Sequence, residues 1–95
     1  MMNEGKAREK QARAEQAEAL LRNNLFNEAF EYLDAQFLDA WRQSDVADTE
    51  NRERIYQLTQ SLATLKGYFQ SVVEDGKLAQ VQLDDFKRRV SINKR

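Results

Sequence analysis

Residues 55–72 read IYQLTQSLATLKGYFQSV and contain six large apolar residues at regular spacing. Its large apolar residues recur at spacings of 3, 4, 3, 4 and 3, which is the a/d pattern of a heptad seam on one face of an α-helix. They are Ile55, Leu58, Leu62, Leu65, Phe69 and Val72. This is the strongest periodic signal in the chain. It predicts a long helix that packs through the seam against another helix.

A second apolar stripe precedes this seam and predicts the helix on which it packs. Its members recur at intervals of four and three, and they are Phe26, Phe30, Leu33, Phe37 and Trp41. Between the two stripes, residues 44–49 concentrate helix-capping residue types, and Glu50 and Glu53 follow where a helix N-terminus favours acid. We therefore expect a short turn and an antiparallel pair of helices.

Downstream of the seam, Gly76 is the residue type that commonly ends a helix. Beyond it, apolar residues at spacings of 4, 3 and 4 predict a short third helix, and they are Ala79, Leu83, Phe86 and Val90. The last residues of the chain, 93–95, form a basic tail.

The first 22 residues form a charged, alanine-rich arm. Residues 4–22 alternate Ala with Lys, Arg, Glu and Gln, and no large apolar residue occurs before Leu20. Such a helix has no core of its own, so we expect it either to fray in solution or to lie on a neighbouring subunit. In the second case Ala7, Ala14 and Ala17 are the residues that would approach the neighbour.

Together these patterns predict an all-α chain. A long N-terminal helix packs antiparallel on a second long helix, and a short C-terminal helix completes the fold. The predicted divisions are residues 1–22 for the arm, 23–92 for the helical hairpin with its third helix, and 93–95 for the tail. No proline breaks the first helix between the arm and residue 43, so arm and stripe can form one helix of about 40 residues.

Composition excludes several classes of function. The 95 residues contain no Cys and no His, which removes disulfides, thiolate or imidazole metal sites and the usual nucleophile pairs. No apolar run reaches the length of a membrane span, and the N-terminus lacks the apolar core of a signal peptide. We expect a non-enzymatic, cytoplasmic protein without membrane, metal or cofactor.

Charge is uneven although the formal net charge is only -1. Residues 23–54 carry three basic and eight acidic groups, and residues 84–95 carry five basic and two acidic groups. The candidate interaction residues are an acidic face of Glu28, Glu31 and Asp34, edge tyrosines Tyr32, Tyr56 and Tyr68, and a basic end for an acidic partner at Lys87, Arg88, Arg89, Lys94 and Arg95. Solvated surface is the alternative for each of these sets. A nucleic-acid partner is not favoured, because no helix-turn-helix or aromatic platform accompanies the cations.

Three segments resemble small helical proteins encoded by tailed bacteriophages and prophages. They are residues 37–41 (FLDAW), 48–56 (DTENRERIY) and 72–79 (VVEDGKLA), and the resemblance covers roughly residues 25–85. It implies a phage origin and a part in the virion or its assembly, with a location in the host cytoplasm or in the virion.

The resulting expectation is a structural or assembly protein that acts through helix-mediated contacts, either with copies of itself as a homo-oligomer or with other phage proteins. The alternative is a phage-encoded inhibitor or adaptor that binds a host protein through the acidic helical face around residues 28–53.

Overall fold

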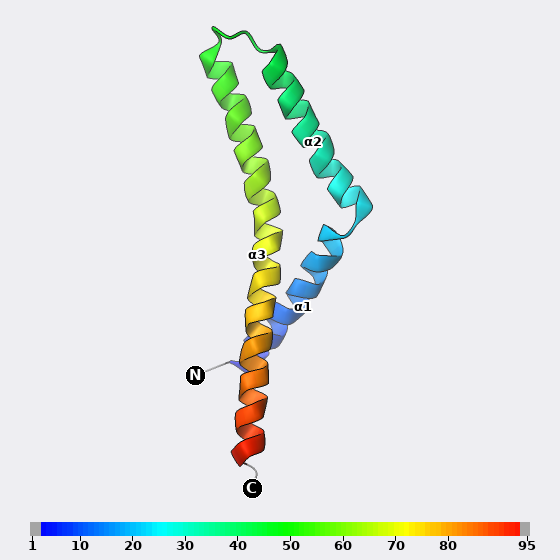
Figure 1. Cartoon of the computed structure of the whole chain (residues 1–95), viewed down its shortest axis with the longest axis vertical. Helices are drawn as coiled ribbons and strands as arrows, with labels where there is room; N and C mark the ends of the chain where they lie inside the picture. Colours follow the sequence, from blue (N-terminus) through cyan, green and yellow to red (C-terminus); the bar gives the residue numbers. More distant parts are fainter. Residues whose placement is uncertain (1–2, 94–95) are drawn as a thin grey trace. The chain divides into compact units, whose positions relative to one another are not determined.

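The computed structural model describes residues 3–93, and in this part of the chain the regular secondary structure consists of α-helices joined by short turns (Figure 1). The helices are α1 (Glu4–Leu21), α2 (Asn24–Gln43) and α3 (Thr49–Asn93). The predicted all-α class is confirmed, but two of the predicted helix boundaries are wrong.

The first correction concerns the long N-terminal helix, which is two helices. The side-chain oxygen of Asn23 accepts a hydrogen bond from the backbone N–H of Phe26 at 2.9 Å, which caps the start of α2. Asn27 donates its side-chain amide to the carbonyl oxygen of Leu21 at 2.9 Å and so satisfies an acceptor at the end of α1. These two asparagines therefore stabilise the boundary between α1 and α2, where the sequence has neither glycine nor proline.

The second correction concerns the predicted third helix, which is the last part of α3. The helix passes through Gly76 without interruption, and no described glycine has a positive φ. The heptad seam also continues in register along α3. One of its rows contains every seventh residue from Ile55 to Val90, and the other contains every seventh residue from Leu58 to Phe86. Gly76 belongs to the row that begins at Ile55, and it lies at a contact with another helix rather than at a helix end.

By its internal contacts the chain divides into two units, and each contains part of α3. The unit Leu21–Tyr68 is an antiparallel hairpin of α2 and the first part of α3 (Figure 1). The buried side chains Phe30, Ile55 and Leu62 form its centre. Two cation–π contacts show the antiparallel pairing of the two helices, because Arg52 lies 4.4 Å from the Trp41 ring centroid and Lys66 lies 6.0 Å from that of Phe30.

The connection between α2 and α3 is built as the capping residues predict. Ser44 ends α2, and its hydroxyl donates to the Trp41 carbonyl oxygen at 2.5 Å. Asp45 accepts a hydrogen bond from the N–H of Ala47 at 2.9 Å, and Asp48 accepts one from the N–H of Asn51 at 3.2 Å. Asp48 therefore acts as the N-cap of α3.

In the other unit, α1 packs antiparallel on the part of α3 that begins at Phe69. Ala7 of α1 forms a buried cluster with Ala79 and Leu83 of α3. Further along, a Cβ atom placed on Gly76 would overlap that of Ala14 and would lie 3.2 Å from the carbonyl oxygen of Lys10. The two backbones thus approach closely because the residues between them are small.

This contact corrects the interpretation of the arm. Ala7, Ala14 and Ala17 are buried within their own chain, so they are not a free surface for a neighbouring subunit. The side chains of Gln11 and Gln80 add a hydrogen bond between α1 and α3. A helix without large apolar residues can dock where the helix that it meets also has small residues at the contact, and composition alone does not show which residues meet.

The two glycines inside α3 give a matched test of this packing. Gly67→Ala should raise the melting temperature, because nothing lies within 4 Å of the new Cβ and alanine favours a helix by up to about 1 kcal/mol. Gly76→Ala gains the same propensity but should lower the melting temperature, because α1 must move away. Thermal melts followed by circular dichroism measure both changes, and an equal rise in both variants would contradict the close contact.

Candidate protein-interaction surface

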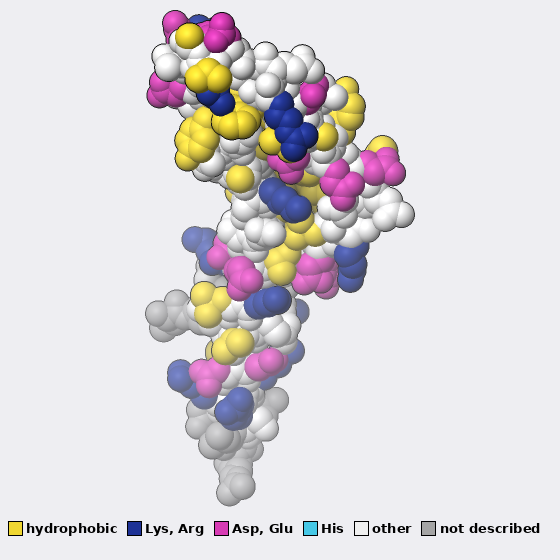
Figure 2. Space-filling view, turned by 45° about the horizontal axis from the view of Figure 1, so that its top comes forward, with side chains coloured by type: hydrophobic (Ala, Val, Ile, Leu, Met, Phe, Trp, Pro, Cys, Tyr) yellow, Lys and Arg dark blue, Asp and Glu magenta, His cyan; other side chains and the backbone are white. Residues whose placement is uncertain are grey.

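The hairpin unit leaves much of its apolar side-chain surface exposed. Phe30, Ile55 and Leu62 are its buried apolar residues, whereas its exposed large apolar residues are Leu25, Tyr32, Leu33, Leu38, Trp41, Val46, Tyr56, Leu58, Leu65 and Tyr68. Figure 2 shows such side chains at the surface among charged ones, near the end that carries the α2–α3 connection. Where such residues are contiguous on one side of the hairpin, they are typical of a protein contact.

The heptad seam itself is only half covered in this unit. Ile55 and Leu62 in one row are 5% and 9% exposed, whereas Leu58 and Leu65 in the other row are 48% and 51% exposed. A single neighbouring helix, α2, covers the first row and leaves the second to solvent. The sequence identified these residues as one seam but could not show which row would lack a partner.

The predicted tyrosines lie on the surface but do not form one site. Tyr32 belongs to α2, and Tyr56 and Tyr68 belong to α3, where twelve residues separate them. At 1.5 Å per residue these two positions are about 18 Å apart along the helix axis. The three tyrosines are therefore separate exposed residues and do not form a common aromatic patch.

The predicted acidic face consists of exposed side chains on α2. Glu28, Glu31 and Asp34 follow one another at intervals of three residues, so they run along one side of the helix. Within residues 3–93, no group of three or more Asp and Glu side chains is placed to hold a metal ion.

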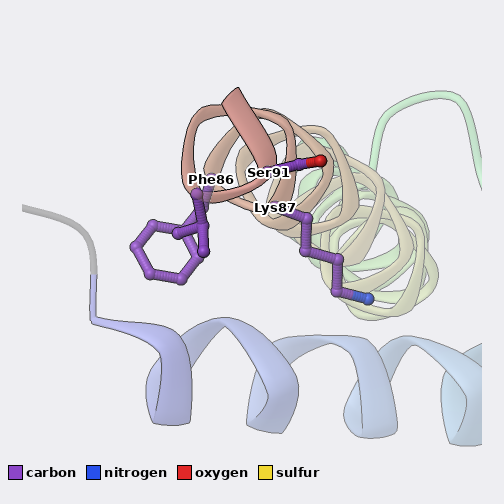
Figure 3. Close-up of a pocket in the computed structure, with 4 residues that line it drawn as sticks. Phe86, Lys87 and Ser91 are labelled. Carbon is purple, nitrogen blue, oxygen red and sulfur yellow. The ribbon is translucent and has the colours of Figure 1, made fainter. Parts of the chain in front are cut away.

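The predicted basic end is only partly described by the structure. Lys87, Arg88 and Arg89 are exposed near the end of α3, and Arg89 pairs with Asp85 at 3.0 Å, whereas Lys94 and Arg95 lie outside the described residues. A shallow hollow here is lined by Phe86, Lys87, Val90 and Ser91. Figure 3 shows Phe86 and Lys87 extending on the side of α3 that faces α1.

Comparison of the chain with known protein families, curated proteins and solved structures finds no match. Within the described part of the chain, none of the helices is both long enough and apolar enough to cross a membrane.

Substitutions at the buried Leu62 and at the exposed Glu31 and Asp34 distinguish residues that stabilise the fold from residues that only form its surface. Leu62→Asp should unfold the hairpin, because it places a charge at a buried position, and an effect of several kcal/mol is expected. Glu31→Ala and Asp34→Ala should each change stability by less than about 0.5 kcal/mol, because both side chains are solvated. Circular dichroism melts compare the three variants, and wild-type melting of Leu62→Asp would refute the assigned core.

Proposed function

We propose that this chain is a non-enzymatic phage structural or assembly protein that works through helix-mediated contacts with other proteins. The observation that carries the proposal is the half-covered heptad seam of the hairpin unit. Leu58 and Leu65 stay exposed beside the buried Ile55 and Leu62. A row of apolar side chains at heptad spacing is complementary in shape to another helix, which supports a protein partner.

The strength of such a contact can be estimated from the side chains that it would bury. Complete burial of a leucine contributes about 1.5–3 kcal/mol relative to full exposure, so half-exposed leucines contribute roughly half of that amount each. Several such residues, together with Leu33 on α2, are exposed in the hairpin unit. A modest affinity per chain follows, which suits an assembly where many copies act together.

The phage assignment within this proposal is supported by the resemblance of residues 37–41, 48–56 and 72–79. In the structure the first of these segments lies in the last turns of α2, and the second contains the N-cap Asp48 and the start of α3. The third contains Gly76, where α1 packs. The resemblance therefore falls on positions that build the fold.

The alternative is an inhibitor or adaptor that binds a host protein through the acidic side of α2. What favours it is the exposure of Glu28, Glu31 and Asp34 at regular helical spacing. A basic groove or helix on a partner would pair with this row, and the contact would weaken as salt rises.

Purified particles of the phage that encodes this chain distinguish the two functions. Mass spectrometry should find the wild-type chain in particles or assembly intermediates. A Leu58→Gln/Leu65→Gln variant should be depleted at least several-fold, because glutamine keeps the helix but removes the apolar row. The matched control replaces Glu28, Glu31 and Asp34 by Gln and should be incorporated normally. Absence of the wild-type chain from particles and intermediates would contradict the assembly function, and loss of binding to a host protein in the control would favour the alternative.

A further inference from the structure

One side of the α2–α3 hairpin is apolar on both helices. The helices face each other through Phe30, Ile55 and Leu62, which are buried. Because they are antiparallel and each residue advances by about 100°, Leu33 on α2 and Leu58 and Leu65 on α3 lie on the same side of the hairpin. The small residues on this side are Ala29 and Ala40 of α2 and Ser61 of α3, all exposed. We call these six residues the neutral face.

The neutral face is free of acidic side chains. Helical periodicity places Glu28, Glu31 and Asp34 on other sides of α2. On α3, Glu50 and Arg54 lie on the same side of the helix as Ser61, but they are about two to three turns away, at the end next to the connection, and they pair with each other at 3.2 Å. This separation stands out because residues 23–54 as a whole carry eight acidic groups and three basic ones.

The charge distribution indicates which partner the neutral face fits. Two copies of so acidic a hairpin repel each other if they meet through the sides that carry Glu28, Glu31 or Asp34. On the neutral face they can meet without opposing like charges, and both copies bury apolar residues. A strongly basic partner would instead be drawn to the acidic side. The surface is therefore matched to a second copy of the same hairpin.

We propose that the hairpin pairs with a second copy of itself across the neutral face, forming a four-helix bundle with two-fold symmetry. The row Leu58, Ser61 and Leu65 suggests the register, because the smallest residue lies between two leucines. A two-fold axis midway between Leu58 and Leu65, next to Ser61, sets the two α3 helices antiparallel and brings Leu58 of each copy against Leu65 of the other. Closed two-fold pairing is the commonest form of homo-oligomer, and bundles of this type pack through such rows. The inference deepens the proposed function by naming the partner of the same surface.

Cysteine crosslinking tests the pairing, because the natural chain contains no Cys. Ser61→Cys places a thiol next to the proposed axis with little change in size. Ala63→Cys is the matched control, because Ala63 is also exposed but lies 200° further round the helix, on the opposite side of α3. A short bifunctional maleimide should convert most of the Ser61→Cys protein into a covalent dimer and little of the Ala63→Cys protein. Light scattering of the wild type at tens of micromolar should give twice the 11.1 kDa of one chain.

Three results would overturn the pairing: equal crosslinking of both cysteine variants, no crosslinking of Ser61→Cys, or a wild-type mass of one chain. The failure of this inference and that of the proposed function are distinguishable. If Ser61→Cys does not crosslink but the chain is found in phage particles, self-pairing is wrong and the assembly function stands. If the dimer forms but the chain is absent from particles and intermediates, the pairing stands and the phage assembly function is wrong.

Discussion

The heptad seam of α3 is the constraint on which the rest of this structure depends. It runs in one register from Ile55 to Val90, and the other helices pack on it at different places. In the hairpin unit α2 covers Ile55 and Leu62, and in the other unit α1 covers Ala79 and Leu83. The residue sizes along the seam decide how closely each neighbour approaches. Large residues pack against the aromatic stripe of α2, whereas the small Gly76 and Ala79 allow the alanines of α1 to approach closely.

Small residues also explain how a polar arm becomes part of the fold. Each alanine buries little apolar area, so the contact of Ala7 and Ala14 with α3 depends on close backbone approach rather than on large side chains. This packing leaves no room for a Cβ atom at Gly76, whereas Gly67 has room for one. It also leaves the exposed leucines of the hairpin unit as the main apolar surface for a partner.

The all-α class, the antiparallel pairing of the helix of residues 24–43 with the next helix and a capped turn within residues 44–49 follow from the sequence, because periodicity and capping act over a few residues. It did not reveal the break at Asn23, because asparagine also occurs inside helices and its capping bond to Phe26 is visible only in the structure. The predicted helix end at Gly76 is wrong because the sequence does not distinguish a glycine that ends a helix from one on which another helix packs. The sequence predicts the residues of the seam but not which of them are exposed, since the exposure of Leu58 and Leu65 depends on the position of α2.

Hydrogen exchange of the full chain is the most direct test of this account. The amides of residues 7–17 should exchange at least tenfold more slowly than in an isolated peptide of residues 1–22, because in the chain α1 is held against α3. The amides around Gly76 should be as protected as those around Leu62, because α3 is continuous there. Exchange of residues 7–17 at the rate of the isolated peptide, together with fast exchange around Gly76, would contradict the packing of α1 on the seam.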